Sequence, residues 1–253
     1  MGTGKLLCAV GGLLVAGFAG PARAEICISI DFGSNLLSTA SAGLASASNW
    51  NNETGKSGAN IALADNSGAG TTALLTYGAA GLYLGFGYPN TPDTNLDTIY
   101  QHALYGDPLN GGEPHLTITG IPYSSYEVYV YASEATNNTS VLSISDGTTT
   151  YYYRSGGGYG GAGKQMAGLT SLTLTTSTNA GSPTVGLAQY QLFTNETSST
   201  LTLTESGSIN GQISNNIFGL QIVETPEPGT LVLMGGGLGS LAAFRRRRMH
   251  AAR

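Results

Sequence analysis

The chain has 253 residues, 38 of them glycine, and a formal net charge of −5 at pH 7. The stretch from Glu25 to Glu224 is more acidic, because its three basic residues and fourteen Asp and Glu residues give a net charge of −11. Proteins that bind nucleic acid use clusters of Lys and Arg to replace the counterions of the phosphates, so this composition excludes nucleic acid as a partner.

The first 24 residues have the pattern of a secretory signal peptide. Lys5 supplies a positive charge, residues 6–18 form an apolar stretch, and Ala22 and Ala24 match the small-x-small cleavage pattern. The pattern predicts a signal-peptide helix over residues 1–24 that signal peptidase removes by cutting before Glu25. The alternative, a short buried helix, explains neither the charge nor the cleavage pattern.

Residues 25–224 are expected to form one β-domain, because hydrophobic and polar residues alternate through most of this stretch. Near its start, Ile28 and Ile30 share one face of a strand, and Ser29 and Asp31 share the other. The same alternation predicts further strands around residues 116–118, 126–131, 142–144, 151–153, 172–174, 201–203 and 218–222.

The connections between these strands also have signals in the sequence. Asp146-Gly147 predicts a hairpin turn before residues 151–153. In the last strand Phe218 is expected on the same face as Leu220 and Ile222. Residues 33–48 and 155–168 carry little strand signal and are predicted to be long surface loops. The pattern as a whole predicts an all-β fold, an antiparallel sandwich.

Catalytic and metal-binding residues are not apparent in the predicted domain. Four carboxylates fall in one loop-rich region, but the sequence does not bring any two together as a glycosidase requires: Asp93, Asp97, Asp107 and Glu113. His102 and His115 lack the spacing of a zinc site. We expect no enzyme activity, no resident cofactor and no metal ligand set. A structural calcium ion stays open, since calcium accepts carboxylate and carbonyl oxygens from irregular loops.

Aromatic residues are the remaining candidates for ligand binding. Trp50 is followed by Asn51 and Asn52, and amides beside an aromatic ring suit a sugar, whose C–H groups pack on the ring while its hydroxyls bind the amides. These three residues are the candidate glycan-binding site. The alternative is that Trp50 anchors the hydrophobic core.

The C-terminal segment resembles a membrane stop signal. Residues 229–244 are apolar and glycine-rich, and Arg245, Arg246, Arg247 and Arg248 follow them. Arginines after an apolar segment stay in the cytoplasm and leave the preceding domain outside. As a helix, residues 229–244 would span about 24 Å, less than the roughly 30 Å of a bilayer core, so we expect a short transmembrane helix that is inserted only transiently.

Pro226, Glu227 and Pro228, the apolar segment and the arginines together resemble the PEP-CTERM sorting signal over residues 225–248, with residues 249–253 as a tail. The resemblance implies recognition by exosortase, a membrane transpeptidase of bacteria that make exopolysaccharide. It also implies cleavage near Pro226 to Pro228 and delivery to the cell surface or the extracellular matrix.

The domain is also similar to PEP-CTERM proteins that have a jelly-roll, galactose-binding-like ectodomain. The residues that carry this resemblance are 28–33, 49–52, 116–131 and 217–223. In such folds the first and last strands lie close together. The resemblance implies an exported, non-catalytic surface or matrix protein associated with exopolysaccharide, with direct glycan binding as one means of association. The alternatives are an adhesin or structural protein without affinity for sugars and, less favoured, a secreted glycan-active enzyme.

Overall fold

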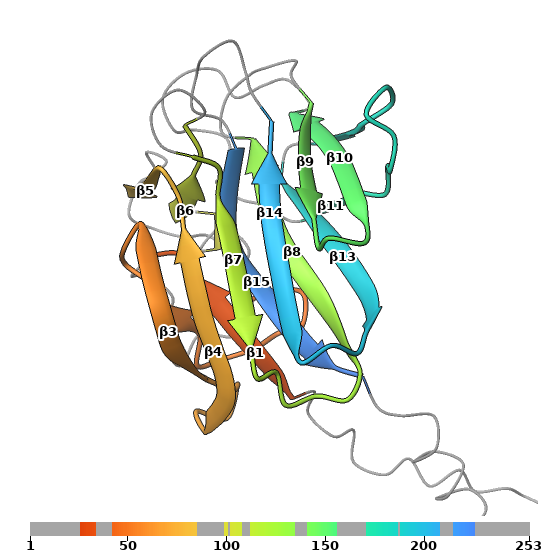
Figure 1. Cartoon of the computed structure of the whole chain (residues 1–253). Helices are drawn as coiled ribbons and strands as arrows, with labels where there is room; N and C mark the ends of the chain where they lie inside the picture. The colour runs from red at the N-terminus through yellow and green to blue at the C-terminus, as the bar shows by residue number, and fades with distance from the viewer. Residues whose placement is uncertain are drawn as a thin grey trace, which may run out of the picture.

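The computed structural model describes residues 26–33, 42–84, 99–100, 102–107, 112–134, 141–155, 171–186, 188–207 and 215–225. These residues form a sandwich of two packed β-sheets (Figure 1). The predicted signal-peptide helix, the predicted C-terminal helix and the tail all lie outside the described residues. Within the described part, no helix is long and apolar enough to cross a membrane.

The first sheet has eight strands. Six of them follow one another across the sheet: β11 (Thr173–Leu174), β13 (Gln189–Glu196), β8 (Tyr126–Glu134), β15 (Asn215–Glu224), β1 (Cys27–Asp31) and β2 (Asn51–Asn52). Where β1 ends, β15 pairs instead with β6 (His102–Tyr105), which in turn pairs with β5 (Gly81–Leu84). The long strand β15 therefore organises this sheet.

The second sheet has seven strands and packs in front of the first in Figure 1. Their order is β12 (Thr184–Gly186), β10 (Thr150–Ser155), β9 (Leu142–Ser145), β14 (Thr200–Ser206), β7 (His115–Thr119), β4 (Gly70–Gly78) and β3 (Ser57–Ala64). The predicted strands around residues 116–118, 142–144, 151–153 and 201–203 all lie in this sheet.

The prediction of an antiparallel sandwich is wrong in one respect, because both sheets are mixed. Three short strands pair parallel to their neighbours: β2 with β1, β12 with β10, and β11 with β13. Each of these strands has only two or three residues and lies at the end of its sheet's strand order. Long connections separate each pair along the chain, and long connections permit parallel pairing, whereas tight hairpins enforce antiparallel pairing.

The first and last strands of the domain are neighbours, as predicted. β1 pairs antiparallel with β15, from Cys27 opposite Val223 to Asp31 opposite Gly219. The described chain therefore begins and ends at one end of the sandwich, where the Glu224 N–H donates to the Ile26 carbonyl.

The predicted hairpin at Asp146-Gly147 is confirmed. It joins β9 to β10, with Ser145 opposite Thr150. Gly147 has a φ of 91°, a left-handed conformation that glycine adopts without strain. The Asp146 carboxylate accepts hydrogen bonds from the backbone N–H groups of Thr148 and Thr149, which fixes the turn.

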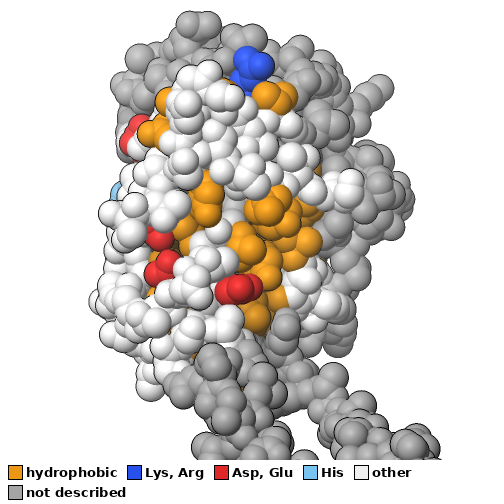
Figure 2. Space-filling model, turned by 90° about the vertical axis from the view of Figure 1, so that its right-hand side faces the viewer, with side chains coloured by type: hydrophobic (Ala, Val, Ile, Leu, Met, Phe, Trp, Pro, Cys, Tyr) orange, Lys and Arg blue, Asp and Glu red, His pale blue; other side chains and the backbone are white. Residues whose placement is uncertain are grey.

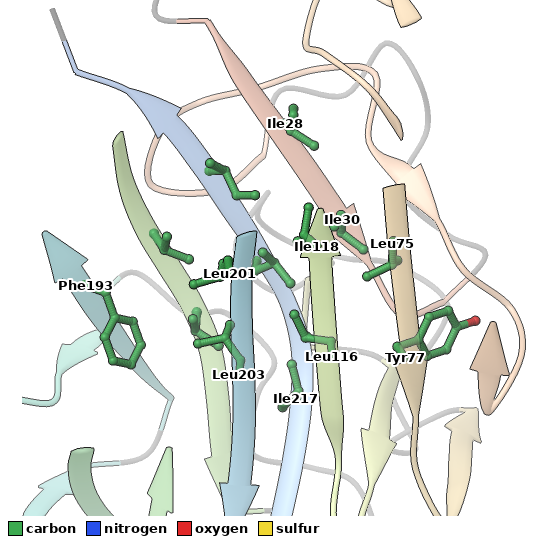
Figure 3. Close-up of a cluster of buried hydrophobic side chains, with 14 of the residues drawn as sticks. Ile28, Ile30, Leu75, Tyr77, Leu116, Ile118, Phe193, Leu201, Leu203 and Ile217 are labelled. Carbon is green, nitrogen blue, oxygen red and sulfur yellow. The ribbon is translucent and has the colours of Figure 1, made fainter. Parts of the chain in front are cut away.

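The main hydrophobic core lies between the two sheets (Figure 3). Ile28 and Ile30 of β1 face Leu75 of β4, Leu116 and Ile118 of β7, and Leu201 and Leu203 of β14, all of them buried. Burial of a large aliphatic side chain contributes about 1.5–3 kcal/mol, so this layer is the principal source of stability. The alternation in the sequence predicted these inward positions correctly in β1, β7 and β14, whereas β4 with Leu75 was not predicted.

Phe218 does not share a face with Leu220 and Ile222, so this prediction is wrong. A register shift interrupts the pairing of β15 with β8 between Ile217 and Gly219. The extra residue of a β-bulge turns the following side chains to the other face. As a result, Ile217 joins the core between the sheets, and Phe218 points into a second cluster on the outer face.

That second cluster covers the outer face of the eight-stranded sheet. It includes Trp50, Tyr100, Tyr131 and Phe218, together with three buried alanines and Ile99. Residues 42–48, predicted to belong to a surface loop, instead turn back through a bridge between Ala42 and Ala47, both of them 1% exposed. β1 is consequently buried on both faces.

Candidate functional site

Trp50 lies in the cluster on the outer face of the eight-stranded sheet. Its side chain is 5% exposed, and its ring centroid is 6.4 Å from that of Tyr131. The indole N–H donates a hydrogen bond of 2.9 Å to the carbonyl of Ala47. This burial agrees with the alternative that Trp50 anchors the hydrophobic core. A ring buried to this extent has almost no surface to offer to a sugar.

Asn51 and Asn52 follow Trp50 in the short strand β2. The Asn51 amide donates to the carbonyls of Ser29 and Ala64 and accepts from the Ala64 N–H, each at 2.9 Å. These bonds tie β1 to the end of β3. Asn52 is exposed, and its amide donates to the carbonyl of Trp50 at 3.3 Å. Of the three predicted glycan-binding residues, Asn52 alone is exposed.

The four carboxylates of the loop-rich region are not shown as one site. Asp93 and Asp97 lie outside the described residues. Asp107 forms a backbone bridge with Gly112. The Glu113 carboxylate accepts hydrogen bonds from the Ser206 hydroxyl at 2.7 Å and from the Gly207 N–H at 3.3 Å. Glu113 therefore holds the end of β14.

A pair of carboxyl groups that the sequence did not suggest lies between two hairpins. Glu196, at the end of β13, forms a side-chain hydrogen bond with Asp146 in the β9–β10 turn. Partial burial, followed by the charge of Asp146 and this hydrogen bond, raises the pKa of Glu196. A glycosidase needs its two carboxyl groups about 5 to 10 Å apart, with the sugar between them.

Glu205 is a fully buried carboxyl group near the end of β14. Its Oε1 accepts hydrogen bonds from the Tyr153 hydroxyl and from the Asn216 N–H of the opposite sheet. Its Oε2 has no hydrogen-bond partner in the structure. Burial raises the pKa of Glu205 to about 8, although the two hydrogen bonds act in the opposite direction. Glu205 is thus neutral at neutral pH and joins the two sheets.

Asp31 is a second buried carboxyl group, at the point where β15 changes partner from β1 to β6. Neither of its carboxyl oxygens has a hydrogen-bond partner in the structure. Burial raises the pKa of Asp31 well above its ordinary value, because a charge without a partner is costly in the interior. Both buried acids therefore favour the protonated form.

Metal ligands do not gather in the part of the chain that the structure describes. No group of three or more His, Cys, Asp or Glu residues in that part could hold a metal ion. His102 lies against Gly33 near the end of β1, and burial lowers the pKa of its imidazole. His115 is exposed, and its Nδ1 lies 3.0 Å from the carbonyl of Glu113. A calcium ion remains an open prediction.

A pair of tyrosines is better placed than Trp50 to meet a ligand. Tyr129 of β8 and Tyr190 of β13 stack on the outer face of the eight-stranded sheet, with ring centroids 6.3 Å apart and an angle of 27° between the ring planes. Both side chains are half-buried. The Tyr129 hydroxyl donates a hydrogen bond of 3.1 Å to the Glu127 carboxylate. The alternation in residues 126–131 placed Tyr129 away from the core but did not reveal its partner Tyr190.

Comparison with known proteins concerns the C-terminal segment. Residues 224–248 match the family of the PEP-CTERM protein-sorting motif, which confirms the resemblance seen in the sequence. No curated protein and no solved structure matches the chain. The galactose-binding-like character of the domain thus stays a prediction. The chain carries a PEP-CTERM sorting motif at residues 224–248, and this motif implies export, processing by exosortase and sorting to the cell surface.

Proposed function

We propose that this chain is a non-catalytic protein of the cell surface or extracellular matrix that associates with exopolysaccharide. The observation that carries the proposal is the sorting motif, because its match implies delivery of the β-sandwich to the outside of the cell. The link to exopolysaccharide comes from the resemblance to proteins that exosortase processes. The acidic character of residues 25–224 and their wealth of hydroxyl groups are compatible with this setting.

The architecture of the domain supports a role in binding or scaffolding. Its two sheets bury a continuous hydrophobic core, and the outer face of the seven-stranded sheet exposes hydroxyl groups in register. Thr117 lies opposite Thr202, and Thr119 lies opposite Thr200. Direct glycan binding is the means of association that we favour.

The proposal is tested by locating the full-length chain in its native host and in an otherwise identical strain that makes no exopolysaccharide. We expect the protein in the surface and matrix fraction of the first strain. In the second strain, more of it should be released into the medium, because its anchoring polymer is missing. Equal amounts in the matrix fractions of both strains would favour the alternative role, an adhesin or structural protein without affinity for sugars.

The sorting step has its own control. Replacement of Arg245 to Arg248 by Gln removes the charges that hold the C-terminus in the cytoplasm. The variant should lose surface sorting while the β-sandwich, which ends before these residues, stays unchanged. Normal sorting of this variant would contradict the role assigned to the motif.

A further inference from the structure

The stacked pair of Tyr129 and Tyr190 lies in an apolar strip on the outer face of the eight-stranded sheet. Leu192 is opposite Tyr129, and Tyr190 is opposite Tyr131, so the two stacked tyrosines are diagonal neighbours across β8 and β13. Leu174 of β11 is paired with Tyr190 and is 38% exposed. Figure 2, seen from the side of β10, β11 and β13, shows hydrophobic side chains gathered in the middle of this view.

The strip rests on a rigid support. Tyr129 and Tyr190 pack against the buried cluster that contains Trp50, Tyr100 and Tyr131. Within that cluster the ring of Tyr100 meets the ring of Tyr131 edge to face, with centroids 6.1 Å apart. Since the supporting rings are buried and interlocked, the two half-buried tyrosines are held in a fixed orientation.

A hydrogen-bonding group lies at the edge of the strip. Glu127 is half-buried on β8, and its carboxylate accepts the hydroxyl of Tyr129. The outer face of an aromatic ring beside a carboxylate suits a sugar ring, whose weakly positive C–H groups pack on the negative aromatic face while a hydroxyl donates to the carboxylate.

We propose that Tyr129, Tyr190 and Glu127 form a binding surface for the sugar rings of an uncharged polysaccharide. This inference rests on the proposed function and specifies the surface and the chemical class of its partner. Charge decides between classes of polysaccharide. Residues 25–224 have a net charge of −11, and Glu127 lies within the surface itself, so a polymer of uronic acids is repelled.

The test is affinity electrophoresis of the mature protein in native gels that contain laminarin, dextran, galactomannan or alginate. We expect retardation by at least one of the three neutral polymers and none by alginate. Tyr190→Ala should weaken the binding by about tenfold, because a stacking contact of this size is lost. Tyr190→Phe keeps the ring and should bind nearly as well as the parent protein.

Tyr152→Ala is the matched control, because Tyr152 is a half-buried tyrosine on the outer face of the other sheet. It should bind like the parent protein, and near-ultraviolet circular dichroism checks that each variant is folded. Absence of retardation by all three neutral polymers would overturn the inference, and so would equal binding by the parent and a folded Tyr190→Ala variant. Neither outcome touches surface sorting, which is measured separately by the location and mass of the chain.

Discussion

The two sheets of the sandwich differ in how many of their faces are covered. The seven-stranded sheet buries its inner face and presents Thr76, Thr117 and Thr202 on the other side. The eight-stranded sheet is covered on both faces around β1, β8 and β15. The same alternation of polar and apolar residues thus has two outcomes. It gives a solvated face where nothing packs on it, and a second buried layer where the chain folds back over it.

Hydrogen bonds reduce the energetic cost of burying polar side chains in the second layer. The Tyr131 hydroxyl donates to the side-chain oxygen Oε1 of Gln221 and accepts from the Leu44 N–H at 2.8 Å. The Gln221 amide donates to the Ser29 hydroxyl at 3.1 Å. A buried polar group without a partner costs about 1–3 kcal/mol, so these bonds let polar residues occupy a buried face. The covered face is therefore specified by paired polar groups as well as by apolar area.

The largest expected effect concerns Glu205, the fully buried acid between the sheets. Because its pKa is raised from 4.5 to about 8 by burial, the folded state binds a proton more tightly than the unfolded state. The contribution of Glu205 to the free energy of unfolding is therefore fully present below about pH 4.5 and is lost as the pH rises to about 8. The fall attributable to Glu205 is on the order of 5 kcal/mol.

The measurement is urea unfolding of the parent protein and of Glu205→Gln between pH 4 and pH 9. The variant keeps an acceptor for Tyr153 and Asn216 but does not titrate. We expect the difference in free energy of unfolding to shift in favour of the variant as the pH rises. A difference that does not change with pH would contradict the buried, protonated state of Glu205.

Trp50→Ala tests whether the second layer belongs to the cooperative core. We expect a loss of about 3–5 kcal/mol in the free energy of unfolding, because a large buried ring leaves a cavity. Leu203→Ala in the layer between the sheets is the comparison, with an expected loss of about 2–5 kcal/mol. If Trp50→Ala cost far less than Leu203→Ala, the layer over the eight-stranded sheet would be a loose cover and not a core.

Tyr131→Phe examines the hydrogen bonds of the second layer. The ring stays in place, but the Gln221 side-chain oxygen keeps only the Ala45 N–H as a donor, and the Leu44 N–H loses its acceptor. We expect a loss of about 1–3 kcal/mol in the free energy of unfolding, measured by denaturant titration. An unchanged stability would mean that water replaces the hydroxyl and that this face is not sealed.

The smallest effect is expected on the solvated face of the seven-stranded sheet. Thr117 points away from the core, and its hydroxyl lies 3.4 Å from that of Thr202. Thr117→Ala should change the free energy of unfolding by less than about 0.5 kcal/mol in the same titration. A larger loss would show that this face, too, is packed in the folded protein.

The sequence predicted the layer between the sheets well, because period-two alternation directly reports an inward face. Ile28, Ile30, Leu116 and Leu203 were all placed there from spacing alone. The bulge at Phe218 could not be predicted, since both faces of β15 are buried and hydrophobic residues on either side of the bulge look alike. Of the three parallel edge strands, β2 and β12 were missed because they are short and have no hairpin turn, whereas β11 was predicted around residues 172–174 but not its parallel pairing.

The candidate sites depended on contacts between distant parts of the chain. Trp50 followed by two asparagines has the composition of a sugar site, but burial by residues 42–48 is invisible in the local sequence. The stacked pair of Tyr129 and Tyr190 depends on the pairing of β8 with β13. The sorting motif, in contrast, is a local pattern of residue types, and for that reason it was recognisable without a structure.

The central claim is that the sorting motif delivers the β-sandwich to the outside of the cell and is then cut. The most direct measurement is the intact mass of the protein recovered from the cell surface and from the culture medium. We predict a mature chain that begins at Glu25 and ends near Pro226 to Pro228, within the matched motif. A chain that retains Arg245 to Arg248 and stays in the membrane would contradict the claim.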